Sequence, residues 1–180
     1  MPRLPRVLVE GGIHHVYNRF ARGEAVFEGE WEVRRFLDLT GEVKERDGFV
    51  ILAWSVLSNH FHLAVRMGPV PLSRSMRSIQ GRFSQAFNIR RGRTGPVWQS
   101  RYQARLVDDS DYLWSLIVYI HMNPVRAGLV EDPMDYPLCG HREIVGRKES
   151  TLVDVDDVLL VFGETRRSAR HQYVKAMEAG

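Results

Sequence analysis

The sequence predicts an α+β fold, in which an antiparallel sheet of four or five strands carries helices on one face. Three observations support this prediction. Apolar runs rich in β-branched residues are bounded by turn residues, two long amphipathic segments separate them, and a further helical segment follows the last run. With 180 residues, of which 44% are hydrophobic, the chain is long enough for one full core. We expect one domain over residues 1–130 and a helical extension over 131–180 that packs on it.

The first half of the chain supplies three strands and a helix. Residues 13–20 are β-prone and follow two glycines. Residues 30–47 repeat apolar side chains at mostly helical spacing until Gly48, which predicts a helix. Residues 49–57 and 60–67 are two apolar runs with a short polar connection between them, which is typical of a β-hairpin.

The second half of the chain continues the alternation of strands and helices. Residues 73–91 form an amphipathic helix that Gly92 is expected to end. Residues 96–107 are expected as a further strand, and residues 110–122 as a helix that Pro124 limits. The resulting order β-α-β-β-α-β, followed by a helix, is the ferredoxin-like split βαβ order. One or two short helices are expected in the extension, over residues 154–162 and 165–178.

Positive charge is concentrated in one part of the chain. Residues 1–130 carry 18 Lys and Arg against 12 Asp and Glu, whereas residues 131–180 carry 7 against 10. Between Asp47 and Asp108 there is no carboxylate, but there are nine arginines and no lysine. Arginine favours bidentate contacts with phosphate and stacking on bases, so this block predicts a surface for a polyanion. The alternative is a solvated helix face.

Aromatic side chains interleave with these arginines, a pattern typical of surfaces that bind single-stranded nucleic acid. We expect Phe83 and Phe87 to lie in the core, and Trp98 and Tyr102 to be stacking platforms. The expected DNA-contacting residues are Arg19, Arg74, Arg77, Arg82, Arg90, Arg91, Arg93, Trp98, Arg101, Tyr102 and Arg105.

The most informative motif is Ser58-Asn59-His60-Phe61-His62-Leu63. On a strand, His60 and His62 project from one face while Phe61 points to the other. Neutral imidazoles bind divalent metals, but two of them need a further donor, which Asn123 would supply as an amide oxygen. Such an open set of two nitrogens and one oxygen suits Mg²⁺ or Mn²⁺ carrying phosphate oxygens of a substrate.

The second motif is Tyr119-Ile120-His121-Met122-Asn123-Pro124. On a helix, Tyr119 and Asn123 lie one turn apart on the same face. A metal-assisted Tyr119 could attack a phosphodiester and form a covalent phosphotyrosine. His121 is a rival ligand, and Tyr112, two turns or about 10 Å before Tyr119, is a rival nucleophile. The motif also has a purely structural explanation. In that case Tyr119 is an aromatic side chain of the core, and Asn123 only ends the helix.

These motifs together resemble the single-tyrosine HUH transposases, and within them the REP-associated tyrosine transposase branch. The resemblance extends from about residue 5 to about residue 146. Ser58 stands where relatives commonly have proline, and Gln103 stands where they have a basic residue. These two differences bear on which DNA sequence the chain prefers. Four blocks carry the resemblance, at residues 58–63, 87–88, 97–104 and 119–130.

The resemblance implies a metal-dependent nuclease and strand transferase that acts on single-stranded DNA at hairpins of palindromic repeats, through a 5′-phosphotyrosine intermediate. By motif, Tyr119 is the nucleophile, His60 and His62 are metal ligands, and Asn123 occupies the third ligand position. Two alternatives remain open at this point: a protein that binds such hairpins without cutting them, and a hydrolase in which water is the nucleophile. The resemblance is compatible with a monomer or a homodimer.

The remaining expectations concern location and the extension. The lone Cys139 cannot form an intramolecular disulfide, residues 1–6 lack the apolar stretch of a signal peptide, and no run of eighteen apolar residues occurs, so we expect a cytoplasmic protein without a membrane span. The acidic extension could fold over the site, brace the tyrosine helix or act as a gate. Its Asp154, Asp156 and Asp157 could compete with DNA.

Overall fold

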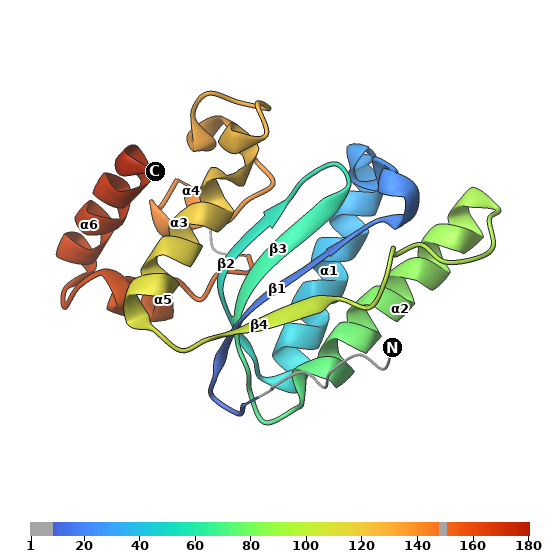
Figure 1. Cartoon of the computed structure of the whole chain (residues 1–180), viewed down its shortest axis with the longest axis horizontal. Helices are drawn as coiled ribbons and strands as arrows, with labels where there is room; N and C mark the ends of the chain where they lie inside the picture. Colours follow the sequence, from blue (N-terminus) through green and yellow to red (C-terminus); the bar gives the residue numbers. More distant parts are fainter. Residues whose placement is uncertain (1–8, 148–150) are drawn as a thin grey trace.

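A computed structural model describes residues 9–147 and 151–180, so the expectation for residues 1–6 lies outside the described residues. The described residues form a four-stranded antiparallel sheet in the order β2-β3-β1-β4 (Figure 1). The predicted α+β fold and its β-α-β-β-α-β order are confirmed. The strands are β1 (Ile13–Arg19), β2 (Val50–Val56), β3 (His60–Arg66) and β4 (Gln103–Val107).

Two long helices, α1 (Glu30–Asp47) and α2 (Leu72–Arg91), cover one face of the sheet (Figure 1). Both end at a glycine in the left-handed region, which accepts this conformation without a Cβ clash. The core beneath them is aromatic, with the ring centroids of Phe36 and Phe61 4.9 Å apart. As predicted, Phe83 and Phe87 are buried there. Short 3-10 turns connect other elements, at Ala21–Gly23, Val26–Glu28 and Pro133–Asp135.

The helix α3 (Ser110–Arg126) lies on the other side of the sheet and contacts β2, β3 and β4 (Figure 1). Its apolar side chains Leu116, Ile117 and Ile120 are buried. The prediction that Pro124 limits this helix at residue 122 is wrong, because the helix continues to Arg126. The turn after Pro124 closes through its own backbone bonds, including the one from the Ala127 N–H to the Asn123 carbonyl at 2.9 Å.

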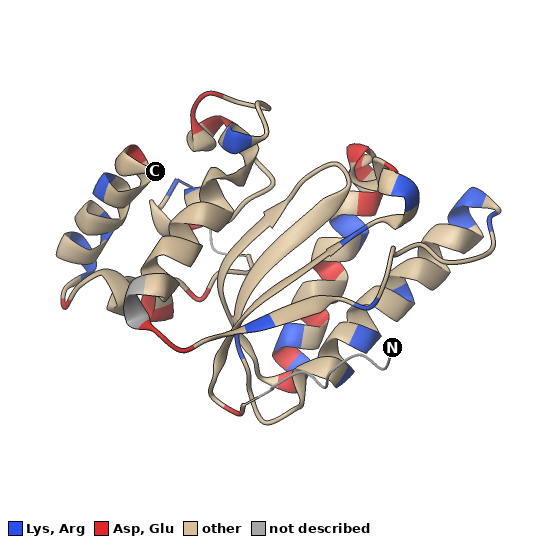
Figure 2. Cartoon of the chain, in the orientation of Figure 1, with Lys and Arg blue, Asp and Glu red and all other residues tan. Residues whose placement is uncertain are grey.

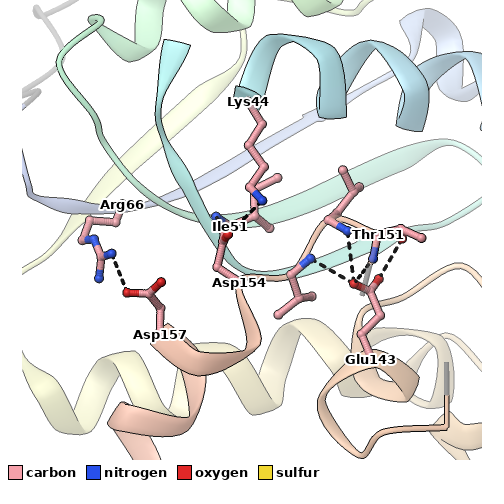
Figure 3. Close-up of polar contacts among 9 residues, drawn as sticks. Lys44, Ile51, Arg66, Glu143, Thr151, Asp154 and Asp157 are labelled. Carbon is pink, nitrogen blue, oxygen red and sulfur yellow. Dashed lines mark hydrogen bonds and ion pairs between the residues drawn. The ribbon is translucent and has the colours of Figure 1, made fainter. Parts of the chain in front are cut away.

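The helices of the extension are α4 (His141–Ile144), α5 (Val155–Phe162) and α6 (Arg166–Ala179), and they pack beside α3. Where one or two helices were expected, α5 and α6 are two separate helices. The extension also covers the outer edge of β2, the strand at one end of the sheet. The backbones of Leu138, Gly140 and Asp154 each form a hydrogen bond of 2.9 Å with β2. The carboxylate of Asp154 accepts a further bond from the Ile51 N–H at 2.8 Å and pairs with Lys44 at 2.8 Å (Figure 3).

The buried carboxylate of Glu143 organises the segment that leads into α5. Its oxygens accept a hydrogen bond from the Trp54 indole at 2.9 Å. They also accept hydrogen bonds from the backbone N–H groups of residues 151–153 at 2.9–3.1 Å (Figure 3). A buried carboxylate is tolerated only when donors surround it in this way. Since these bonds join α4, β2 and residues 151–153, one side chain fixes the path of the extension.

The three aspartates of the extension, at positions 154, 156 and 157, form contacts that hold the extension in place. Asp154 bonds to the edge of β2, Asp157 pairs with Arg66 at 2.6 Å (Figure 3), and Asp156 pairs with Arg166. These contacts give the three carboxylates a role in anchoring the extension, while competition with DNA stays a prediction. Among residues 9–147 and 151–180, no helix combines the length and apolar character needed to cross a membrane.

Candidate active site

His60 and His62 project from the face of β3 that α3 covers, while Phe61 points into the core beneath α1 and α2. The two imidazole centroids are 5.1 Å apart. The ring of Tyr119, from α3, lies edge-on to His62 with centroids 5.8 Å apart. Strand periodicity and helix packing thus bring these three side chains into one cluster.

A cavity of about 400 Å³ opens at this cluster. All four residues predicted as nucleophile and metal ligands line it, together with Arg19 from the predicted DNA surface. Tyr119 is 36% exposed and is therefore accessible to a substrate in the cavity. The full lining is Tyr17, Asn18, Arg19, His60, Phe61, His62, Gln99, Ser100, Gln103, Tyr119 and Asn123.

Asn123 is buried, and its amide nitrogen donates to the Tyr119 carbonyl at 3.3 Å. The side-chain oxygen of Asn123 is then the amide atom that can bind a cation. Because α3 continues beyond Pro124, the Arg126 guanidinium lies 5.4 Å from the centroid of the Tyr119 ring. Arg126 was not among the residues predicted from the sequence, although its position seven residues after Tyr119, two helical turns along the same face, was a signal for it.

His15, on β1 beside β3, is a further residue of the cluster that was not predicted from the sequence. Its Nε2 is 3.0 Å from His62 Nδ1, and this contact is buried. The other histidine of the motif has a neighbour of its own, since His60 Nδ1 is 2.6 Å from the Asn59 side-chain oxygen. The alternation of residues 15, 17 and 19 along β1 was the signal, because they share the sheet face of His60 and His62.

Burial keeps these imidazoles neutral. It lowers the pKa of His62 to about 3, with His15, His60 and Arg19 adding to the effect, and the pKa of His15 to about 4, with a contribution from Arg105. Burial, and then Arg19, also lowers the pKa of His60. Neutral imidazoles are the form that binds a metal ion, so protons do not compete for these nitrogens near neutral pH.

The donor set fits an open divalent-cation site. His60 and His62 each have one ring nitrogen engaged by a neighbour, which leaves the other for a cation, and the Asn123 amide can add an oxygen. Within residues 9–147 and 151–180, no group of three or more His, Cys, Asp or Glu side chains is arranged to hold a metal. A cation here would therefore keep positions for water or phosphate oxygens.

The rival residues of the tyrosine helix lie elsewhere. His121 is fully buried on the side of α3 that faces the extension, where its Nδ1 is 2.8 Å from the hydroxyl of Tyr173 in α6. The same hydroxyl is 2.7 Å from Nδ1 of His141 in α4. Tyr112 is 44% exposed and lies outside the described lining of the cavity. Of the suggested roles for the extension, bracing of the tyrosine helix is the one that these contacts favour.

The arginine block is less free than its sequence suggests. Figure 2 shows bands of basic residues along α2 opposite mixed charges on α1. Three of the predicted DNA-contacting arginines form ion pairs, Arg82 with Glu42, Arg91 with Glu32 and Arg93 with Glu24, at 2.6–2.8 Å. These three arginines are therefore partly neutralised, and the predicted surface for a polyanion is less positive than the charge count along the chain indicates. Among the predicted DNA-contacting arginines, those that are exposed and form no ion pair with the described residues are Arg19, Arg74, Arg77, Arg90, Arg101 and Arg105.

The segment before β4 also differs from its prediction. The expected strand over 96–107 is wrong, because only residues 103–107 join the sheet and Trp98 makes a single bridge to Phe20. One face of the Trp98 ring stacks on Phe20 with centroids 4.4 Å apart, and Tyr102 is buried. Tyr102 thus does not offer the predicted stacking face, and Trp98 has one face occupied by the core.

Comparisons with known proteins show the family of the chain and the likeness of its fold. The sequence profile of the family described as Transposase IS200 like matches residues 9–123. A REP-associated tyrosine transposase from Escherichia coli (strain K12) is 28% identical over 106 residues, and the match spans 57% of this chain but only 61% of that relative. A solved structure of a REP-associated tyrosine transposase bound to a REP hairpin has a TM-score of 0.71 at 23% identity, covering 82% of this chain and 87% of that chain. The likeness to that structure concerns the fold.

Proposed function

The chain belongs to the IS200-like transposase family, and on this premise we propose that it cleaves and rejoins single-stranded DNA at hairpins of palindromic repeats. The observation that carries the proposal is the cavity shared by Tyr119, His60, His62 and Asn123. Resemblance to REP-associated tyrosine transposases supports the choice of hairpin DNA as substrate. In this proposal residues 1–130 contain the catalytic domain, and residues 131–180 form an extension that holds the tyrosine helix.

The proposed reaction is a transesterification at phosphorus. The hydroxyl oxygen of Tyr119 attacks, a P–O bond to tyrosine forms, and the bond between phosphorus and the 3′ oxygen of the strand breaks. The phenolic proton leaves to solvent, and the departing 3′ oxygen takes up a proton to become a hydroxyl. The DNA 5′ phosphate remains on Tyr119 until a 3′ hydroxyl reverses the step. Arg126, 5.4 Å from the ring, places positive charge beside the attacking phenol.

We propose Mg²⁺ or Mn²⁺ as cofactor, held by His60, His62 and the Asn123 oxygen. When bound, such an ion polarises the phosphodiester and stabilises negative charge on its oxygens. The protein's part is to orient these donors and to keep both imidazoles neutral. Arg19 lies in the same cavity and can contact a neighbouring phosphate. For the DNA surface we retain the exposed arginines that have no ion pair to the described residues.

A covalent-adduct assay tests this function. Purified protein is incubated with Mg²⁺ or Mn²⁺ and an oligonucleotide containing a palindromic hairpin, and is then denatured and resolved on a gel. We expect a denaturant-resistant adduct that Tyr119→Phe abolishes while hairpin binding stays within a few-fold. Tyr112→Phe, an exposed tyrosine of the same helix, is the matched control and should keep full adduct formation.

Three results would count against the proposal. Binding without cleavage by the unaltered protein would favour a hairpin-binding protein that does not cut DNA. Cleavage that survives in Tyr119→Phe would assign the attack to water or to Tyr112. Adduct formation that persists after removal of divalent ions by a chelator would contradict metal dependence.

A further inference from the structure

The hydrogen bond between His15 and His62 decides which nitrogen of His62 is available to a cation. A neutral imidazole carries one N–H donor and one bare acceptor nitrogen. His15 Nε2 and His62 Nδ1 are 3.0 Å apart in a buried contact. One nitrogen of this pair must therefore carry the proton, and the other must accept the hydrogen bond. If His15 donated the proton, His62 would carry its own proton on Nε2 and would turn an N–H toward the cavity.

His60 shows the arrangement that a ligand needs. Its Nδ1 lies 2.6 Å from the Asn59 side-chain oxygen, which can only accept a hydrogen bond. His60 therefore carries its proton on Nδ1 and has a bare Nε2. Metal-binding histidines generally donate their second ring N–H to such a partner, which fixes both the tautomer and the ring orientation.

We propose that His15 is a positioning residue whose Nε2 accepts a hydrogen bond from the N–H at His62 Nδ1, so that His62, like His60, presents a bare Nε2 to the cavity. The inference rests on the proposed function, because it assigns a role toward the cation of that site. A neutral His15 then carries its own proton on Nδ1. His15 does not ligate the cation; it acts through His62.

The contacts of His15 support this role. The planes of the His15 and His62 rings differ by only 24°, and their centroids are 5.2 Å apart, so the two rings meet edge to edge through the nitrogens that are 3.0 Å apart. The centroid of the His15 ring is 6.2 Å from the Tyr119 ring, on the same side of the sheet as the cavity. With only 7% of its surface exposed, His15 has little freedom to rotate away, so it can hold the His62 ring in one orientation.

Two measurements that do not depend on catalysis test the inference. The first is long-range ¹H–¹⁵N NMR of the metal-free protein, which reports the protonated nitrogen of each imidazole; we expect His62 to be protonated on Nδ1. The second is calorimetric titration with Mn²⁺ in the absence of DNA. Here His15→Leu should weaken Mn²⁺ binding about 10- to 100-fold, as loss of such a partner typically does.

Two further variants separate positioning from folding. His15→Gln places an amide near the position of the lost Nε2, so it should restore Mn²⁺ affinity to within a few-fold. His171→Leu, a change of an exposed histidine in α6, should leave affinity unchanged. Thermal unfolding of each variant confirms that the titrations use folded protein.

The outcomes distinguish the inference from the proposed function. Protonation of His62 on Nε2, or equal Mn²⁺ affinity of the unaltered protein and His15→Leu, would overturn the role of His15 even if the covalent adduct forms. If no adduct forms, the proposed function fails, and the NMR measurement still decides the His62 tautomer. Weak binding by both His15→Leu and His15→Gln would also overturn the inference, because the hydrogen-bond acceptor would then not be the property that matters.

Discussion

Replacement of Tyr173 by phenylalanine should destabilise the protein although it removes only one oxygen. That hydroxyl lies 2.8 Å from His121 Nδ1 and 2.7 Å from His141 Nδ1, and all three side chains are buried. Because burial raises the pKa of Tyr173 well above its usual value and lowers the pKa of both histidines, the three groups are neutral. The single hydroxyl therefore donates one hydrogen bond and accepts the other.

Phenylalanine fills nearly the same volume but leaves both histidine nitrogens without this partner. A buried polar group that loses its partner costs about 1–3 kcal/mol, so the loss at two histidines should lower the unfolding free energy by about 2–6 kcal/mol. For a chain of this length each kcal/mol lowers the melting temperature by about 2–4 °C, which predicts a decrease of about 4–24 °C.

Thermal and urea unfolding followed by circular dichroism would measure this change. Tyr112→Phe, which removes an exposed hydroxyl from α3, is the control and should stay within about 0.5 kcal/mol of the unaltered protein. A change for Tyr173→Phe no larger than that of the control would refute the reasoning that these hydrogen bonds hold α3, α4 and α6 together.

Two further predictions concern pH and salt. Burial lowers the folded-state pKa of His15 and His141 to about 4 and that of His62 to about 3, from an ordinary value of 6.5. As pH falls, these histidines therefore take up protons in the unfolded chain before they do so in the folded protein. The unfolding free energy should be highest above pH 6.5 and should decrease below that pH by at most about 1.4 kcal/mol per pH unit for each histidine. Urea unfolding at a series of pH values measures this decrease, and an unfolding free energy that stays constant down to about pH 5 would contradict it. For DNA binding, Arg105→Ala should reduce the slope of log affinity against log salt concentration by about one. Arg82→Ala should change this slope much less, because Arg82 already forms an ion pair with Glu42. Equal slopes for the two variants would show that ion pairing within the protein does not decide which arginines contact phosphate.

Features that depend on one element could be predicted from the sequence. The shared face of His60 and His62 requires only that residues 60–66 form a strand, and the alignment of Tyr119 with Asn123 requires only a helix. The order of strands and helices followed from apolar spacing and from glycines at helix ends. The cavity contains all four of these side chains because α3 packs on the sheet face from which the two histidines project.

Features that depend on which elements become neighbours could not be predicted in this way. His15 meets His62 only because β1 lies next to β3 in the sheet. Arg82 and Glu42 are 40 positions apart, so a count of charges along the chain cannot show their pairing. The apolar character of the segment around Trp98 suggested a strand, but that side chain packs on Phe20 instead of extending the sheet.

The cover that Leu138, Gly140 and Asp154 form over β2 bears on how the protein behaves in concentrated solution. A bare edge strand offers a row of open N–H and C=O groups to any other extended chain and so invites sheet-to-sheet joining and aggregation. Here the following segment of the same chain occupies several of these groups along the seven residues of β2. A shortened chain that ends near residue 130 would expose that edge, and its loss of solubility would then reflect an unprotected strand and not a damaged catalytic centre.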